Sequence, residues 1–289
     1  MQIMHFTPPQ LASIFQVNET TIKRWIWAGK LKASLTTGRH YRVSRDQLND
    51  FFKRYPKISL NSYVIRRYSK QKEKKIQEWE EYYDLMLKNK HEEAFVLLQS
   101  TYLSGNNITN IVDTYIVPVL HKIGFDYSKE IISIYEEHRM SFRISEQLSK
   151  LEQFVSKNNK NRKRAILLCA EGDNHIIPLQ MLNLVLGKNN IDTHVLGMNI
   201  SYEQLEKAVK EIKPNMICIT KLYNINNPKK YLEKTKKLTK KYKIFIALGG
   251  PGWNEEIKKN LHRNIRWFGS MGSLEKFLST KGGLKLSDL

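Results

Sequence analysis

Asp173 and His175 are the residues whose types and spacing most clearly suggest chemistry. They lie in the stretch EGDNHIIP, residues 171–178, which follows an apolar run from Ala165 to Ala170. An imidazole can bind a metal through one ring nitrogen while the other nitrogen donates to a carboxylate, which sets the tautomer and raises the basicity of the ligand. The stretch is therefore either a single-histidine metal ligand or a turn in which Asp173 holds His175.

Other chemistries fit this stretch poorly. A zinc site needs further Cys, His or Glu ligands at suitable spacing, and none is found. A hydrolase of the nucleophile-elbow type needs G-x-S-x-G, and a dinucleotide site needs G-x-G-x-x-G, but the stretch holds one glycine. A single histidine suggests a cofactor that brings its other metal ligands with it, as a corrinoid does.

Residues 163–282 carry the elements that would position this pair. Short apolar strands are expected at 165–170, 193–196, 216–220, 244–248 and 265–268, with helices starting near Pro178, Ser201, Pro228, Asn254 and Ser273. The alternation predicts an α/β domain with a doubly wound, five-stranded parallel sheet, which binds ligands at the carboxyl ends of its strands. The Asp173–His175 pair follows the first strand. Pro178 suits the first turn of the next helix, because its φ is already helical.

Residues 76–157 show a helical pattern that predicts a small four-helix bundle, in which Pro118 would kink the third helix or lie near its end. Residues 57–75 are polar and basic, and we expect a linker there.

Residues 1–56 are expected to form two short helices, a hairpin around Gly38 and a third helix. Thr7 and Gln10 fit a capping box, Asn18 begins the second helix, which would run to Gly29, and Trp25 is expected in the core. Two short helices a few residues apart indicate a helix-turn-helix.

The charge distribution indicates a polyanionic partner. The chain carries a formal net charge of +20, and residues 1–75 account for +12 of it. Neutralising phosphates releases counterions, so such a basic segment favours nucleic acid, although an AT-rich genome would also enrich lysine. No apolar run is long enough to span a membrane, no signal peptide is expected, and two cysteines suit a reducing cytoplasm.

The order helix, turn, TTIKRWIWAGKLKA and then TTGRHYRVSRDQLNDFF resembles the winged helix-turn-helix of the MerR and excisionase group. The resemblance implies that the second helix enters the major groove of double-stranded DNA and that the hairpin, or wing, contacts the backbone. The residues that it places at the DNA are Thr20, Thr21, Lys23 and Arg24 on the helix, and Arg39, His40, Tyr41 and Arg42 on the wing.

The stretch around His175 resembles the Asp-x-His-x-x-Gly signature of cobalamin-binding domains, in which the histidine is the lower axial ligand of cobalt. Such domains have a Ser/Thr-x-Leu element after the third strand and a Gly-Gly after the fourth. Here Thr220 and Leu222 supply the first element. Gly249 and Gly250 supply the second, where the resemblance implies that the nucleotide tail passes close to the backbone.

The domain order resembles that of light-sensing regulators of the CarH/LitR kind: a MerR-type head, a four-helix bundle and a cobalamin-binding domain. In their bundle a tryptophan, nine residues and then Glu-His cover the upper face of the cobalamin. This chain has Tyr127 in place of the tryptophan, followed by Glu137 and His138. It also has Ser128 where light-switched members have a cobalt-capturing histidine, and Pro178 where the signature has glycine.

We therefore expect a cytoplasmic transcriptional regulator rather than an enzyme: a repressor that binds DNA under the control of cobalamin, with adenosylcobalamin as the form favoured. Changes in a homo-oligomer would set operator affinity, and photolysis of the cobalt–carbon bond would reverse them. Two alternatives remain: a MerR-type regulator whose cobalamin domain acts without cofactor, and a corrinoid carrier, against which the basic helix-turn-helix argues.

Overall fold

The computed structural model describes residues 5–15, 17–55, 78–103, 106–152, 163–223, 228–259 and 261–280. The expected linker at 57–75 lies outside these ranges. The chain divides into two compact units, residues 1–143 and 144–289, which are described separately. No helix in the described ranges is long and apolar enough to cross a membrane.

The amino-terminal elements form a winged helix-turn-helix. Helix α1 (Pro8–Phe15) and helix α2 (Glu19–Trp27) precede the strands β2 (Ser34–Leu35) and β3 (Tyr41–Ser44) and helix α3 (Arg45–Arg54). The short strand β1 (His5–Phe6) pairs antiparallel with β3, which also pairs with β2. Thr7 and Gln10 exchange the two capping-box hydrogen bonds, at 2.8 and 3.4 Å, so that expectation is confirmed.

The core of this domain is aromatic. Trp25 is half-buried and contacts the buried Phe15 and Phe51, each with ring centroids 5.3 Å away, so it packs against the core as expected. Helix α2 ends at Trp27, two residues before the expected Gly29, because Gly29 has a left-handed φ of +68° that terminates a helix. Asn18 precedes α2, but its side chain makes no capping hydrogen bond.

The next segment is helical in every described range. It contains α5 (Glu78–Leu87), α6 (His91–Leu103), α7 (Ile108–Ile111), the π-helical turn η1 (Val112–Ile116), α8 (Val117–Ser128) and α9 (Ile134–Leu151). Pro118 lies inside the third helical run, which is unbroken from Ile108 to Ser128, directly after the π-turn and in the first turn of α8, so it marks an irregularity within that helix and not its end. Proline cannot bond to the carbonyl four residues back, and the wider π-turn accommodates this break.

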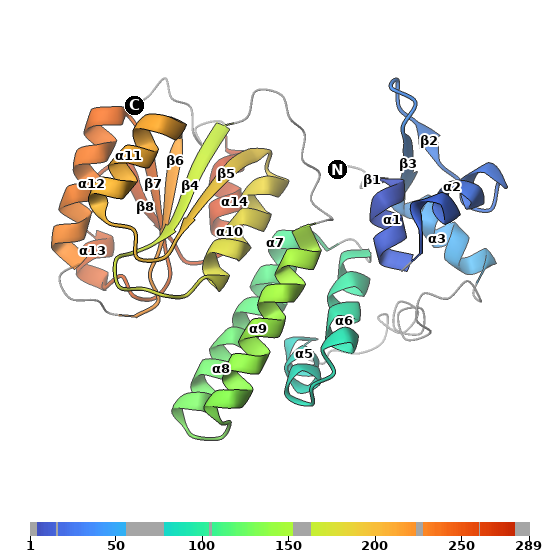
Figure 1. Cartoon of the computed structure of the whole chain (residues 1–289), viewed down its shortest axis with the longest axis horizontal. Coiled ribbons are helices and arrows are strands. Elements are labelled where there is room, and N and C mark those ends of the chain that lie inside the picture. Colours follow the sequence, from blue (N-terminus) through green and yellow to red (C-terminus); the bar gives the residue numbers. More distant parts are fainter. Residues whose placement is uncertain are drawn as a thin grey trace. The chain divides into compact units, whose positions relative to one another are not determined.

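The second unit contains a five-stranded parallel sheet in the order β5-β4-β6-β7-β8 (Figure 1). Its strands are β4 (Lys163–Cys169), β5 (Ile191–Gly197), β6 (Met216–Thr220), β7 (Phe245–Gly249) and β8 (Ile265–Phe268). This is the flavodoxin-like order, and the doubly wound fold expected from the sequence is confirmed. The order reverses between β4 and β6, so the carboxyl end of β4, which leads into Asp173, is at the switch point.

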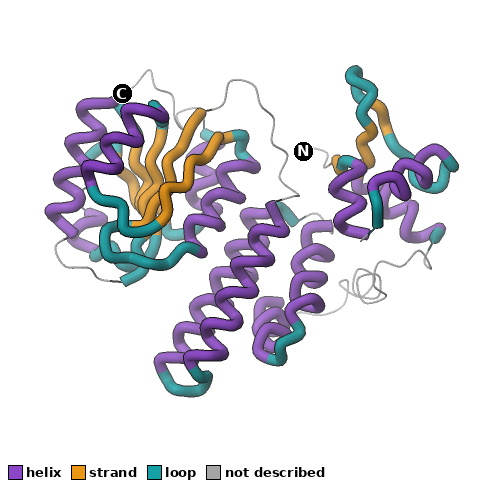
Figure 2. The backbone as a smooth tube through the Cα atoms, viewed as in Figure 1, coloured by secondary structure: helices purple, strands orange, loops and turns teal. Residues whose placement is uncertain are grey.

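Helices cover both faces of this sheet (Figure 2). Alternate β4 residues point to opposite sides, as the period of two requires. Ala165, Leu167 and Cys169 pack in a cluster with residues of α10 (Ile177–Lys188) and α14 (Met271–Ser279). Ile166 and Leu168 pack in a second cluster with residues of α11 (Tyr202–Ile212), α12 (Pro228–Tyr242) and α13 (Glu255–Lys259). The last helix begins at Met271 rather than near Ser273, with Ser270 as its cap.

Candidate functional site

A tight turn at the end of β4 places Asp173. The Asp173 amide donates to the Ala170 carbonyl at 2.9 Å, and Gly172 within this turn has a φ of +81°, which glycine adopts without strain. The Ala170 amide in turn donates to the Thr220 carbonyl of β6 at 2.8 Å. The acidic elbow is thus tied to the two central strands and is not a free surface turn.

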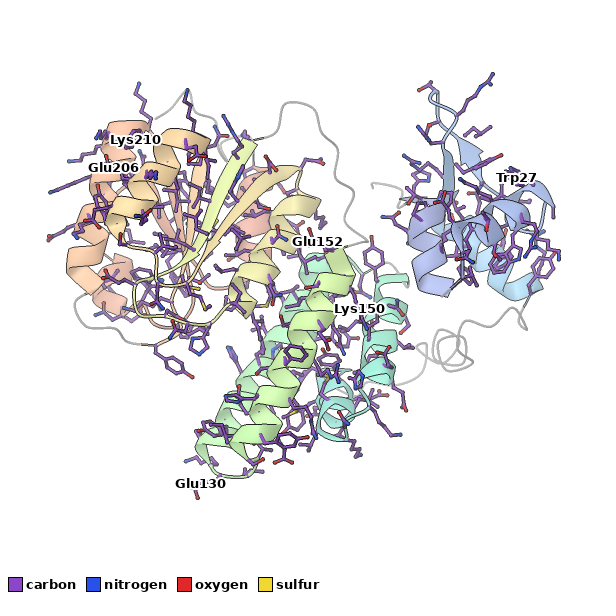
Figure 3. The ribbon with its side chains drawn as sticks, viewed as in Figure 1. Trp27, Glu130, Lys150, Glu152, Glu206 and Lys210 are labelled. Atoms are coloured by element: carbon purple, nitrogen blue, oxygen red, sulfur yellow. The ribbon has the colours of Figure 1, made fainter. Side chains whose placement is uncertain are left out.

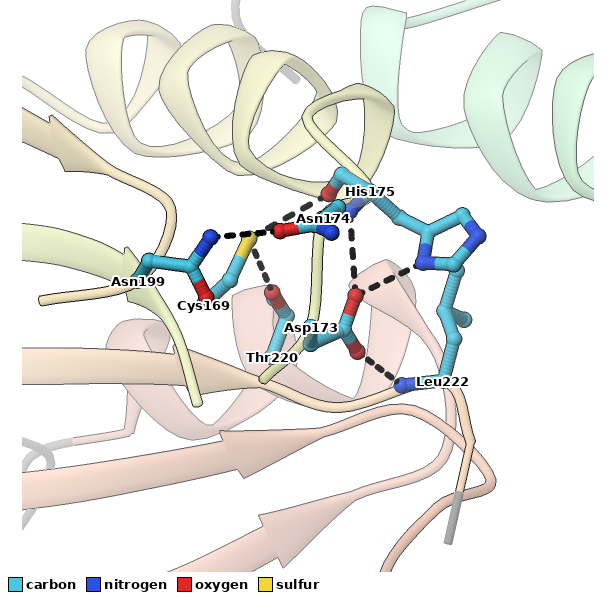
Figure 4. A network of polar contacts seen from close by, with 7 residues as sticks. All are labelled: Cys169, Asp173, Asn174, His175, Asn199, Thr220 and Leu222. Carbon is cyan, nitrogen blue, oxygen red and sulfur yellow. Dashed lines mark hydrogen bonds and ion pairs between the residues drawn. The ribbon is translucent and has the colours of Figure 1, made fainter. Parts of the chain in front are cut away.

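Both oxygens of the Asp173 carboxylate are occupied (Figure 4). Oδ1 accepts from the His175 amide at 3.0 Å and lies 2.7 Å from His175 Nδ1, and Oδ2 accepts from the Leu222 amide at 2.6 Å. Asp173 is only 4% exposed. A carboxylate buried this deeply stays in place because hydrogen bonds satisfy it on each side.

The Asp173 contact determines what His175 can do. An ionised carboxylate only accepts, so Nδ1 carries the proton and Nε2 keeps its lone pair. The His175 side chain is 42% exposed, and its ring lies 5.0 Å from that of Tyr223, between centroids. The pair therefore leaves Nε2 as the oriented imidazole nitrogen that can bind a metal. Within the described ranges, no three His, Cys, Asp or Glu residues gather to hold an ion on their own.

The Thr220–Leu222 segment meets the elbow mainly through its backbone. Leu222 contributes the amide bonded to Asp173, whereas the Thr220 hydroxyl is buried and points to Cys169 Sγ at 3.6 Å. Lys221, between them, is 1% exposed, with its ammonium 5.3 Å from the Trp253 ring centroid. Burial lowers the pKa of Lys221, and the nearby negative charge of Asp173 partly opposes this shift.

The two glycines after β7 differ in their surroundings. A Cβ on Gly249 would meet nothing within 4 Å, so this position faces open space. Gly250 has a φ of +94°, and a Cβ there would overlap the backbone of Lys221. Space for a ligand thus exists beside Gly249. Position 250 requires glycine because its φ is positive and because the Lys221 backbone approaches it closely.

Pro178 does not disturb the elbow. Helix α10 begins at Ile177, and Pro178 lies in its first turn, buried, where no backbone N–H is required. The proline that replaces the signature glycine is therefore part of a regular helix start.

Tyr127, Glu137 and His138 belong to the other compact unit. Tyr127 is 45% exposed near the end of α8, and the adjacent Ser128 hydroxyl donates to the Phe125 carbonyl at 2.7 Å. Glu137 Oε1 accepts from Ser141, and its Oε2 lies 3.4 Å from Nε2 of the exposed His138. The α8–α9 hairpin also exposes large apolar side chains: Phe125, Ile131, Ile134, Tyr135 and Phe142.

A buried polar group lies directly before Tyr127. Asp126 accepts from the Tyr83 hydroxyl at 2.5 Å and from Lys122 at 2.6 Å. Burial acts to raise the pKa of Asp126, but the hydrogen bonds from Lys122 and Tyr83 outweigh it and lower the pKa. The carboxylate therefore joins α5 to α8 in its ionised form.

The helix-turn-helix displays the residues expected at DNA on the helix α2 and the wing. Thr20, Arg24, Arg39 and His40 are exposed, and Thr21, Lys23, Tyr41 and Arg42 are half-buried. Two of the cations are already engaged: Lys23 pairs with Glu19 at 2.7 Å, and Arg42 donates to the Tyr41 carbonyl at 2.9 Å. Arg39 has a left-handed φ of 57°, which is costly away from glycine.

Sequence reasoning missed three residues at these sites. Tyr223 and Lys221 flank Leu222, and Trp27 lies on α2 with its ring 69% exposed. Trp27 could have been identified from the sequence. It follows Trp25 by two residues, and residues two positions apart on a helix do not share a face, so Trp27 could not face the core with Trp25.

Comparison with known proteins gives two matches along the sequence. Residues 6–56 match the family described as a helix-turn-helix domain, and residues 163–263 match the family described as a B12 binding domain. No curated protein matches the chain.

Among solved structures, the chain is similar to the monomethylamine corrinoid protein of Methanosarcina barkeri, with a TM-score of 0.56 and 15% identity. That similarity covers 69% of this chain and 96% of the other, and it shows the fold. A cobalamin-binding protein from Desulfitobacterium hafniense DCB-2 is 12% identical, with a TM-score of 0.38, over 70% of this chain and 96% of its own.

The fold and its two matched regions define the class: a helix-turn-helix DNA-binding domain joined to a B12 binding domain. This composition supports a DNA-binding regulator that responds to cobalamin. It is the composition of a CarH-like regulator with a cobalamin-binding domain.

Proposed function

We propose that this protein is a cytoplasmic transcriptional repressor of the MerR type that adenosylcobalamin controls. The Asp173–His175 contact carries the proposal, because it supplies one oriented imidazole nitrogen at the switch point of a B12-type fold. A helix-turn-helix on the same chain would allow ligand binding at this site to change binding to double-stranded DNA.

The residues present fit a corrinoid. In the proposal His175 Nε2 would bind the cobalt of the corrinoid, with Asp173 fixing the imidazole and the Leu222 amide fixing Asp173. Thr220 supports the elbow through Cys169, the nucleotide tail passes Gly249, and Gly250 shapes the loop beside it. Tyr127, Glu137 and His138 would cover the upper face of the corrinoid, as the resemblance to CarH/LitR regulators implies. Bound adenosylcobalamin would supply a cobalt–carbon bond that light can break.

The DNA-binding part of the proposal rests on α2 and the wing. Thr20, Thr21, Lys23 and Arg24 would lie in the major groove, and Arg39, His40, Tyr41 and Arg42 would contact the backbone. Corrinoid binding changes DNA affinity only if the two DNA-binding states differ in their affinity for the cofactor. We propose that a change in homo-oligomeric state provides this difference.

The test uses full-length protein and a DNA duplex selected from a random pool by the cofactor-free protein. Affinity and gel-filtration volume are measured without cofactor, with adenosylcobalamin in the dark, and after illumination. We expect adenosylcobalamin to change affinity about 5- to 150-fold, the usual range for coupled sites, together with the oligomeric state. Equal affinity and elution volume under all three conditions would contradict cobalamin control, and a change that survives illumination would contradict the light response.

A cofactor-independent regulator is the second candidate. It is favoured by Ser128, whose hydroxyl is used within α8 and offers no metal ligand, and by the Lys221 backbone that fills the space beside Gly250. Protein that stays colourless after incubation with cobalamin, yet binds its selected duplex, would favour this candidate.

A further inference from the structure

The exposed Trp27 is bonded to the wing. Its indole Nε1 donates to the Tyr41 hydroxyl oxygen at 3.0 Å, across 14 residues of sequence, and joins the end of α2 to β3. Trp27 lies at the surface of the helix-turn-helix (Figure 3). A tryptophan that exposes 69% of its surface gains little from burial, so packing does not explain it.

The same two side chains line an open cleft of about 630 Å³ between α2, the wing and the start of α1. Four further side chains in this cleft can be cationic: Lys23, Arg39, His40 and Arg42. One acid, Glu19, also lines it, and Lys23 neutralises this acid at 2.7 Å. The chemistry of the cleft suits an anion.

The Trp27 contact orients the Tyr41 hydroxyl. A phenolic oxygen has one proton to donate, and here the oxygen accepts from an indole N–H that can only donate. Within the described part of the chain, no acceptor is recorded for the Tyr41 proton, so the hydroxyl is a free donor beside the cationic side chains. A neutral donor of this kind bonds strongly to an ionised oxygen.

We propose that Trp27 is a positioning residue of the DNA interface: its indole N–H fixes the Tyr41 hydroxyl so that Tyr41 donates to a DNA backbone phosphate seated in this cleft. The inference rests on the proposed DNA-binding function and adds to it a defined phosphate site. Trp27 acts through Tyr41, and its loss weakens binding only while the Tyr41 hydroxyl is present.

The experiment is a double-mutant cycle on the full-length protein. The probe is a fluorescently labelled 30-base-pair duplex of mixed sequence, titrated by anisotropy at several KCl concentrations. The variants are W27F, Y41F and W27F/Y41F, and thermal melting shows that each is folded. W27F keeps an aromatic ring but removes the indole N–H together with part of the ring area. Y41F removes only the hydroxyl and keeps the ring at this wing position.

We expect Y41F to weaken binding about tenfold, as for loss of a hydrogen bond to a charged group, and W27F to weaken it at least about threefold. In the Y41F background, W27F should cause no further loss of affinity. A residue that touched DNA directly would still weaken binding in that background. Neither variant should change the slope of log affinity against log salt. R39Q and R42Q should each reduce that slope by about one, because they remove a charge at a phosphate.

Two results overturn the inference: W27F that binds like the wild type, or W27F that weakens binding equally with and without the Tyr41 hydroxyl. Failure of the proposed function looks different, because the wild type itself would then not bind the duplex at any salt concentration. If Y41F melts early, the whole cycle is measured at a temperature below its melting transition, where all four proteins are folded.

Discussion

Asp173 Oδ1 lies 2.7 Å from Nδ1 of His175, and this contact determines which imidazole nitrogen is free. The other oxygen of the same carboxylate accepts from the Leu222 amide, so every group hydrogen-bonded to the carboxylate is a donor. His175 is thereby oriented by a side chain that is itself held by the backbone just after strand β6.

Replacing Asp173 with Asn should weaken corrinoid binding. One of the two acceptor oxygens becomes an NH2 donor, which must face a donor either at His175 or at Leu222. We expect the affinity for adenosylcobalamin to fall about 10- to 100-fold, which is the usual loss when the hydrogen-bond partner of a metal-bound histidine is mutated. Equilibrium dialysis in the dark measures it.

The chain provides a matched control. Asp192 and His194 have the same Asp-x-His spacing on strand β5, with the carboxylate 3.4 Å from the ring nitrogen. D192N should bind corrinoid like the wild type. Equal losses in D173N and D192N would show that general destabilisation, rather than ligand orientation, causes the effect.

Gly249 and Gly250 should respond differently to alanine. Gly250→Ala forces a left-handed φ on alanine and a clash with Lys221, so we expect a loss of about 1–3 kcal/mol in unfolding free energy. Gly249→Ala meets open space and should leave the melting temperature unchanged, but it should weaken corrinoid binding if the nucleotide tail passes there. Calorimetry and dialysis on the two variants separate these effects. Unchanged corrinoid affinity in Gly249→Ala would place the tail elsewhere.

Glu19→Gln should strengthen DNA binding. Glu19 is the acid of the cationic cleft and engages Lys23, so its neutralisation removes repulsion toward phosphate and frees a cation. We expect affinity to rise about threefold and the magnitude of the salt slope to increase by up to about one. Anisotropy titration of the mixed-sequence duplex measures both. Glu211→Gln is the control, because it makes the same charge change on the exposed end of α11; an equal gain there would assign the effect to net charge alone.

Asp126 should make the helical segment sensitive to acid. Its pKa is lowered in the folded protein, so its contribution is complete above the pKa of an unfolded Asp, about 3.9, and is lost as the pH falls through the folded value. Asp126→Asn should cost about 2 kcal/mol at pH 7, since it breaks a buried pair whose lysine is partly exposed. It should also flatten the acid side of a stability curve followed by circular dichroism. A variant whose acid transition matches that of the wild type would show that other carboxylates control it.

The positions of the strands along the chain and the place of the elbow could be predicted from the sequence, because these depend on local periodicity. The period-two pattern of β4 and the Pro178 helix start are local, and both were predictable. The Leu222–Asp173 hydrogen bond spans 49 residues, and the burial of Lys221 depends on the Gly250 loop closing over it. Neither follows from a local pattern, and the π-turn before Pro118 likewise depends on how the helices pack.

The most direct test of the central claim is the visible spectrum of adenosylcobalamin bound in the dark to the wild type, to His175→Ala and to the control His194→Ala. Because the spectrum depends on the lower axial ligand of cobalt, we predict that the wild type and His194→Ala give the same spectrum and that His175→Ala gives a different one. Identical spectra for the wild type and His175→Ala would contradict ligation by His175, and a wild type that retains no corrinoid would contradict the cofactor itself.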